Sequence, residues 1–234
     1  MSGFGRRKFL ASLGLAGMSA AATPLAAGGQ ESMALRVAVV KTVSEGLMFE
    51  HSIIQRLMGI YEECADRLAG GRELPPGVVT NAGVLADEFV ENYHEAWEEG
   101  HLYAPFRGTG ALTDVIRVMT RQHRVGRRLV QRTIFLSGKE SGEAAVRDEL
   151  AELCRAYPRM YRAHAAREDT VLLPNSEVIG GAEMYAALHR AMMAFRRSRL
   201  GTLNLNGVLS DVKDLEDQLG IRDLDHYTAE MPEA

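Results

Sequence analysis

Apolar residues recur at steps of three, four or seven along most of the chain, which is the spacing of amphipathic helices. The pattern covers four long stretches, at about residues 47–68, 81–103, 111–136 and 142–173. No stretch alternates apolar and polar residues over the length of a strand, and clusters of β-branched residues are few. The pattern therefore predicts an all-α protein.

Glycine and proline mark where the expected helices end. Gly70-Gly71 closes the first, Pro105 the second, Ser137-Gly138 the third and Pro174 the fourth. Pro158 lies inside the fourth, where its missing amide hydrogen and its ring predict a kink or bulge.

Four long amphipathic helices with short or moderate loops predict an antiparallel up-down four-helix bundle, placed at residues 43–200. A shorter helix at about 180–200 and a last one at about 209–219 should flank or cap it, so residues 201–234 form a helical C-terminal extension. We see no second domain boundary.

The first 27 residues predict an export signal. Two adjacent arginines, Arg6-Arg7, precede an uncharged apolar run from Leu10 to about Ala22 that ends among small residues and is short for a membrane span. The arginines followed by Phe9-Leu10 resemble a twin-arginine signal, which implies export of a folded protein by that machinery to the periplasm or the exterior. An uncleaved signal acting as an anchor is the lesser alternative, and residues 28–42 are expected to link the signal to the first helix.

Composition narrows the function classes. The chain has 234 residues, is 46% hydrophobic and carries a formal net charge of −4, so it can form a packed core and does not suggest a nucleic-acid partner. Its two cysteines, Cys64 and Cys154, form no CxxC pair, which excludes a zinc–thiolate site. Cys64 falls well off the core-facing stripe of its helix, so two free thiols are expected rather than a disulfide.

Four histidines, one in each long helix, continue the apolar stripe that builds the core: His51, His94, His123 and His164. A single histidine on such a stripe is most often a core residue whose nitrogens find partners. Four in four successive helices must share one bundle interior, which favours a common role.

Two of these histidines have a glutamate four residues later, Glu98 and Glu168, and therefore on the same helix face. Two buried carboxylates that face each other repel unless they share a proton or bind cations. A pair of divalent ions between them would remove the repulsion, because each carboxylate can bridge both ions. Imidazole and carboxylate ligands suit iron, manganese or zinc.

The pattern His51, His94xxxGlu98, His123, His164xxxGlu168 resembles the hemerythrin-like, HHE cation-binding family, over roughly residues 43–200. The surroundings Phe49-Glu50-His51, Arg121-Gln122-His123 and Glu168-Asp169 are similar as well. The resemblance implies two non-haem iron ions with an oxo or hydroxo bridge, six ligands of which the glutamates bridge, and a small ligand such as O2, NO or peroxide. The six ligands would be His51, His94, Glu98, His123, His164 and Glu168.

One position departs from the oxygen-carrying hemerythrins, which have a further histidine one turn after the third-helix ligand. This chain has Arg127 there, so it resembles the four-histidine, two-glutamate variant linked to iron-centre repair and stress. Reversible oxygen carriage is thereby placed in doubt. Gly126, beside the core stripe, is expected either to leave room for a small ligand or to allow close helix packing.

Alternatives stay open at this point. A di-iron redox enzyme with its own redox partner, and a structural zinc or manganese site, fit the same ligands. A ferritin-like site needs Glu-x-x-His on two helices, but Glu91-x-x-His94 and Glu98-x-x-His101 lie on one helix, so we exclude it.

Overall fold

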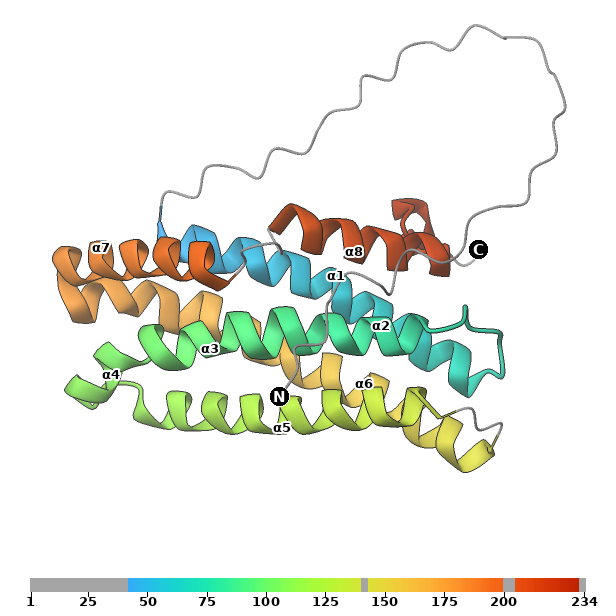
Figure 1. Cartoon of the computed structure of the whole chain (residues 1–234). Helices are drawn as coiled ribbons and strands as arrows, with labels where there is room; N and C mark the ends of the chain where they lie inside the picture. Colours follow the sequence, from blue (N-terminus) through green and yellow to red (C-terminus); the bar gives the residue numbers. More distant parts are fainter. Residues whose placement is uncertain (1–41, 140–142, 200–204, 232–234) are drawn as a thin grey trace, which may run out of the picture. The chain divides into compact units, whose positions relative to one another are not determined.

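A computed structural model describes residues 42–139, 143–199 and 205–231 (Figure 1). Within these ranges the chain forms helices and turns and no strand, which confirms the expected all-α class. The expected export signal and nearly all of the linker after it lie outside the described residues. No helix within the described ranges is both long and apolar enough to cross a membrane.

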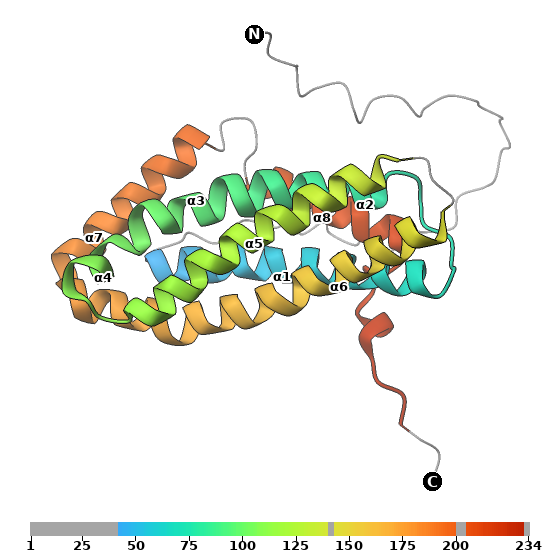
Figure 2. The same cartoon turned by 90° about the horizontal axis from the view of Figure 1, so that it is seen from below.

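Four long helical runs lie side by side (Figures 1 and 2). Their packing forms a ring, since the first run packs on the fourth, the fourth on the third, the third on the second, and the second on the first. The first is α1 (Val43–Ala69) and the third is α5 (Thr113–Ser137). The second joins α2 (Val78–Leu85), the π-helical η1 (Ala86–His94), α3 (Glu95–Trp97) and the π-helical η2 (Glu98–Leu102), and the fourth joins α6 (Ala144–Arg167) and the π-helical η3 (Glu168–Leu172).

Local sequence explains where α1 begins and ends. Thr42 and Glu45 form a reciprocal capping box, in which each side chain accepts a hydrogen bond from the other residue's backbone amide. At the other end, Gly70 is the C-cap residue and its amide donates to the carbonyl of Asp66, as the sequence indicated. The first helix is thus fixed locally before any packing is considered.

The three prolines differ in what they do to the helices. Pro105 lies in the first turn of a short extra helix, α4 (Ala104–Thr109), where its missing amide hydrogen matters least. Pro158 is accommodated within α6, and the helical path continues through Pro174 into α7 (Leu173–Arg199), so the prediction that Pro174 ends the helix is wrong. Pro174 comes two residues after the last residue of the π-helical turn, where the regular hydrogen-bond ladder is already interrupted.

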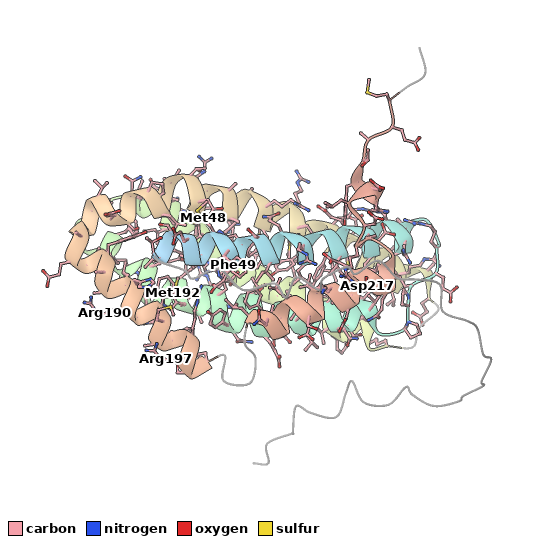
Figure 3. The ribbon with its side chains drawn as sticks, turned by 90° about the horizontal axis from the view of Figure 1, so that it is seen from above. Met48, Phe49, Arg190, Met192, Arg197 and Asp217 are labelled. Carbon is pink, nitrogen blue, oxygen red and sulfur yellow. The ribbon has the colours of Figure 1, made fainter. Side chains whose placement is uncertain are left out.

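The break comes at Gly181 instead, whose φ of 74° and ψ of 168° are open to glycine but strained for other residues. Beyond it, α7 turns back along α1, and Met192 is buried while Arg190 and Arg197 are exposed (Figure 3). The last long helix, α8 (Leu205–Leu219), packs on α1 and α2, and a 3-10 turn, η4 (Leu224–Tyr227), follows it.

The packing of α7 and α8 on α1 corrects one expectation about the cysteines. Cys64 was expected to lie off the core face of α1, yet it is 1% exposed and belongs to the core. The reason is that α1 packs against neighbours on several sides, α6, α7, α8 and α2 among them, so few of its positions face water. Both cysteines are free thiols, as expected.

The core has two apolar clusters separated by a polar layer. Along α1, Val43 and Leu47 belong to one cluster and Ile53 to Ala65 to the other. Along α5, Met119 and Val130 are divided between the clusters in the same way. In every long run, the histidine singled out in the sequence lies between the two apolar clusters or at the edge of one of them. The two clusters therefore enclose a buried polar layer.

Candidate metal centre

The structure brings the six predicted residues together in that polar layer. Each is between 0% and 2% exposed. They form two overlapping groups whose ligand atoms lie within 4.8 Å of one another, and Glu98 and Glu168 belong to both. One group adds His51 and His94, and the other adds His123 and His164.

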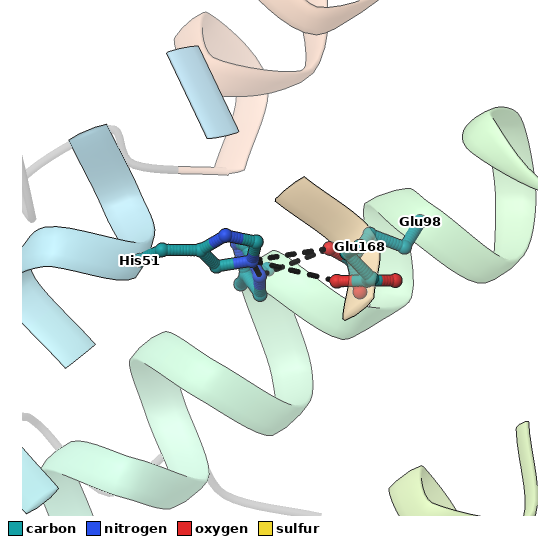
Figure 4. Close-up of side chains that lie close together, drawn as sticks. His51, Glu98 and Glu168 are labelled. Atoms are coloured by element: carbon teal, nitrogen blue, oxygen red, sulfur yellow. Dashed lines mark hydrogen bonds and ion pairs between the residues drawn. The ribbon is translucent and has the colours of Figure 1, made fainter. Parts of the chain in front are cut away.

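In the first group, His51 Nε2 and His94 Nε2 lie 3.1 Å apart and face the carboxylates. Glu98 Oε1 is 3.0 Å from His94 Nε2 and 3.8 Å from His51 Nε2. Glu168 Oε2 is 3.4 Å from His51 Nε2, and the approach of His51 to both glutamates is visible in Figure 4.

The second group mirrors the first. His123 Nε2 and His164 Nε2 are again 3.1 Å apart. Glu98 turns its other oxygen, Oε2, to within 3.5 Å of His123 Nε2, and Glu168 Oε2 lies 3.4 Å from His164 Nε2. Glu98 therefore offers one oxygen to each pair of histidines.

Each histidine is oriented through its other ring nitrogen. The Nδ1–H groups donate to four acceptors on neighbouring runs, at 2.7 to 3.0 Å. This leaves every Nε2 as the atom that points into the layer, the arrangement found in metal sites whose histidines are fixed from behind. The pairs are His51 with Asp169, His94 with Glu50, His123 with Glu99, and His164 with Gln122.

Every one of these acceptors is the sequence neighbour of a predicted ligand on another run. Glu50 precedes His51 and Gln122 precedes His123, while Glu99 and Asp169 directly follow the two glutamates. Each run thus supplies one acceptor that orients the histidine of the next run around the ring. Glu50, Gln122 and Asp169 belong to the motifs noted in the sequence, where no role was assigned to them; the signal was a polar residue directly beside four of the six ligands.

Glu50 is anchored by a residue far along the chain. Arg196 of α7 donates to Glu50 Oε1 at 2.7 Å, and the hydroxyl of Tyr93 donates to the same oxygen at 2.9 Å. Burial by itself raises the pKa of Glu50, but His94 and Arg196 outweigh it and hold this pKa below its ordinary value. Glu50 therefore stays an anion behind His94.

Tyr103 is a further residue of the site that the sequence did not reveal. It is fully buried, and its hydroxyl donates to Glu168 Oε1 at 2.6 Å and lies 3.3 Å from His123 Nε2. This bond occupies one oxygen of Glu168 and leaves Oε2 facing the histidines.

Arg127 lies where the extra histidine of oxygen carriers would be, and its side chain turns to an acidic row on the second run. Its guanidinium donates to Glu99 at 2.6 Å and lies 3.5 Å from Glu95 and 3.7 Å from Glu91. Glu91 and Glu95 are buried, with 2% and 1% exposure. No fifth histidine approaches the polar layer among the described residues.

The space beside Gly126 is already filled. A Cβ at this position would lie 3.1 Å from Glu91 Oε1 and 3.3 Å from the Tyr157 ring. Of the two roles considered for this glycine, close packing fits and room for a small ligand does not.

The electrostatics of the layer follow from its carboxylates. Burial lowers the pKa of His94, but Glu98 and Glu50 outweigh it and raise this pKa to about 9. Burial also lowers the pKa of His51, but its hydrogen bond to Asp169 and the nearby Glu168 and Glu98 carboxylates outweigh burial and bring this pKa well above its ordinary value. Burial raises the pKa of Glu168, yet His164 and His51 bring it well below the ordinary range. Without metal, protons on histidines balance the carboxylate charge.

The donor set fits a cation. Both oxygens of Glu98 and Oε2 of Glu168 are buried and have no hydrogen-bond partner. Orphaned carboxylate oxygens in a protein interior are expensive, and cations that bind both imidazole and carboxylate would satisfy them.

Comparison with known proteins agrees with this donor set. The model of the hemerythrin HHE cation binding domain matches residues 42–176, more than half of the chain. The chain belongs to the hemerythrin HHE cation-binding family. All six converging residues lie inside the matched range, and membership of this family indicates metal binding, with iron as the expected metal.

Curated relatives of this family member come from mycobacteria. Uncharacterized protein Mb2018 of Mycobacterium bovis (strain ATCC BAA-935 / AF2122/97) and Uncharacterized protein Rv1995 of Mycobacterium tuberculosis (strain ATCC 25618 / H37Rv) are each 31% identical over 188 residues. The similarity covers 80% of this chain and 74% of each relative. No solved structure gives a significant match.

Proposed function

We propose that this HHE-family protein binds two iron ions inside an antiparallel four-helix bundle. The observation that carries the proposal is the pair of donor groups that share Glu98 and Glu168 and place two histidines on each side. Each ion would be held by two imidazoles and by the shared carboxylates of Glu98 and Glu168. The six ligands are then those expected from the sequence.

A bound iron pair would supply electron exchange with a small oxidant or diatomic ligand, for which O2, NO and hydrogen peroxide are the candidates. The chain's own residues define the surroundings of that chemistry. The hydroxyl of Tyr103 donates a hydrogen bond to Glu168 Oε1 and thereby fixes which oxygen would face the ions. The apolar clusters on both sides keep bulk water out of the layer.

We favour a reactive centre over a reversible oxygen carrier. Arg127 is held by Glu99 and therefore offers no ligand where the carriers have a histidine. Its ion pairs tie the third run to the second without reaching the polar layer. Export by the twin-arginine route, which carries folded proteins, would deliver the protein to the periplasm with its metal already bound.

The test is the metal content of protein exported from its native host, measured together with its optical spectrum before and after hydrogen peroxide. We expect two irons per chain and a spectrum that changes with peroxide. Zinc as the dominant metal, or a single ion per chain, would contradict the proposal.

Variants locate the ligands. His94→Ala and Glu168→Ala should each abolish the binding of two metals, because each removes a donor from a buried site. His101→Ala is the matched control, since His101 lies on the same run, is only partly buried and stacks on Trp97 outside the polar layer. Two irons retained in either ligand variant would refute the assignment.

A further inference from the structure

A row of buried tyrosines leads away from the proposed metal centre. The ring of Tyr161 lies 5.6 Å from that of His164, Tyr157 lies 6.0 Å from Tyr161, and Tyr61 lies 5.3 Å from Tyr157, measured between ring centroids. All three tyrosines are 1% exposed. Tyrosine rings in contact can pass single electrons from one to the next. The row therefore forms a continuous route from His164, a proposed ligand, into the core.

Only one tyrosine of the row has a base. The hydroxyl of Tyr157 donates to Glu91 Oε1 at 3.0 Å, whereas the hydroxyls of Tyr61 and Tyr161 have no hydrogen-bond partner. A neutral tyrosine loses an electron far more easily when its proton can pass to a group within hydrogen-bond reach. Tyr157 is thus the member of the row that can be oxidised.

Glu91 is free to take that proton. Its second oxygen, Oε2, has no hydrogen-bond partner, and the nearest guanidinium nitrogen, Arg127 Nε, is 3.7 Å away. Burial outweighs the interactions with the neighbouring Glu95 carboxyl and with Tyr157 and raises the pKa of Glu91 above its ordinary value, which favours the protonated form of Glu91.

Two other tyrosines donate to carboxylates near the layer, but both acceptors are committed. Glu50, which accepts from Tyr93, already receives two donors from Arg196 and one from His94. Glu168, which accepts from Tyr103, is a proposed ligand of both ions. Neither carboxylate can accept a proton without giving up another function.

Gly126 on α5 gives this pair its space. A methyl group there would press on both Glu91 Oε1 and the Tyr157 ring, as close as 3.1 Å. The glycine, the buried acid and the tyrosine come from three different runs and meet at one hydrogen bond.

From this arrangement we propose that Tyr157 and Glu91 form a redox-active pair that supplies one electron to the centre through Tyr161. The inference rests on the proposed iron function. When the centre reduces hydrogen peroxide, Tyr157 becomes a neutral tyrosyl radical and its phenolic proton passes to Glu91.

The step balances with peroxide as the two-electron oxidant. One electron comes from Tyr157 and one from an iron(II) ion, which becomes iron(III). The O–O bond of hydrogen peroxide breaks, and with two protons from solvent it yields two water molecules. The phenolic O–H bond breaks, and a new O–H bond forms on the Glu91 carboxylate.

The experiment is rapid freeze-quench electron paramagnetic resonance of the full-length, iron-loaded protein mixed with hydrogen peroxide. Protein made with ring-deuterated tyrosine identifies the radical, because deuteration narrows its hyperfine pattern. Iron content and the optical spectrum are measured on the same samples. We expect a tyrosyl signal in the wild type and its loss to background in Tyr157→Phe.

Glu91→Gln provides a second variant that keeps Tyr157, because an amide can accept a hydrogen bond but cannot hold the proton. It should also lose the signal while it retains iron. Tyr61→Phe is the matched control, since it removes a buried hydroxyl from the same row without touching a base, and it should keep the signal.

The outcomes separate the two proposals. A wild-type protein that binds two irons and consumes peroxide but shows no tyrosyl radical overturns the inference and leaves the proposed function standing. A radical that persists in Tyr157→Phe and disappears in Tyr103→Phe also overturns it, because Tyr103 would then be the donor. Failure to bind iron would show itself in the metal assay and defeat the proposed function.

Discussion

At the scale of single residues, the layer depends on which nitrogen of each histidine faces inward. An imidazole presents Nε2 to a metal only if its Nδ1–H is held elsewhere, and here each holder comes from the neighbouring run. The cluster is therefore preorganised, and the residues behind the histidines should influence metal affinity almost as strongly as the ligands.

Gln122→Ala tests this dependence. Removing the amide that accepts from His164 Nδ1 at 3.0 Å should weaken metal binding by about 10- to 100-fold, measured by competition with a chelating dye. Gln131→Ala is the control, because Gln131 is an exposed glutamine of the same helix that donates to Asp87. Equal affinities for the two variants would show that the imidazole orients itself without help.

Protons and metal should compete for the same nitrogens. In the metal-free protein the pKa of His94 is raised to about 9 and that of His51 well above its ordinary value, so this pair of rings holds Nε2 protonation at pH 7 that an incoming cation must displace. Affinity for Zn²⁺, used as a redox-inert probe, should therefore rise as pH increases from 7 to 9. Calorimetry in buffers of different ionisation enthalpy should detect proton release at pH 7, and binding without it would contradict the charge balance.

The stability of the metal-free protein should change with pH in the direction opposite to its metal affinity. A histidine whose folded-state pKa is raised stabilises the fold fully below its unfolded-state pKa, near 6.5, and this contribution is lost as pH rises through the folded value, about 9 for His94. The metal-free protein should therefore lose stability between these limits just as its metal affinity improves.

At the scale of elements, the π-helical turns decide what could be predicted. Both glutamates begin such turns, Glu98 in η2 and Glu168 in η3. A π turn adds about one residue to the helical repeat and shifts the phase of everything after it. Each glutamate lies four residues after a histidine, before the turn that it begins can shift the phase, so both His–Glu pairs could be found in the sequence. Tyr103 follows η2, fell out of phase and was missed.

Three other features were also mispredicted or overlooked. Pro174 follows η3, so its missing amide hydrogen ends no ladder. Cys64 was judged from the stripe of α1 alone, which carries no information about α7 and α8. Glu91 and Glu95 look like surface acids in the sequence, and only the packing of α5 against the second run shows that they are buried.

Gly126→Ala probes the contact between elements. The added methyl would lie 3.1 Å from Glu91 Oε1, so we expect overpacking that lowers the free energy of unfolding by about 1–3 kcal/mol. Gly100→Ala is the matched control, because nothing lies within 4 Å of its Cβ and replacing a helical glycine should be neutral or stabilising. Thermal and urea unfolding of both variants check this, and equal effects would show that the space at Gly126 is compliant.

At the scale of the whole molecule, the polar layer ties the four long runs together. Each run contributes at least one ligand, so bound metal can stabilise only the assembled fold. Chelation should lower the melting temperature, and metal at 100 times its dissociation constant should stabilise by about 2.7 kcal/mol per site. An unchanged melting temperature after verified metal removal would mean that the layer is held by its protonated histidines alone.

Arg196 extends this dependence to the C-terminal helices. Arg196→Gln removes the guanidinium that holds Glu50, which in turn holds His94, so binding of one of the two ions should weaken. Arg197→Gln is the control, because that neighbouring side chain is exposed (Figure 3). A stepwise metal titration would resolve the difference, and identical titrations for both variants would show that α7 does not influence the centre.

The turn at Gly181 thereby makes the two halves of the centre unequal. His123 and His164 are oriented by side chains of the second and third runs. The acceptor of His94 is Glu50, which is itself anchored by Arg196 in the part of α7 that follows residue 181. During folding, the group that contains His123 and His164 can therefore form before the group that contains His51 and His94. The first cation should therefore be captured there, and the second only after the C-terminal region has docked.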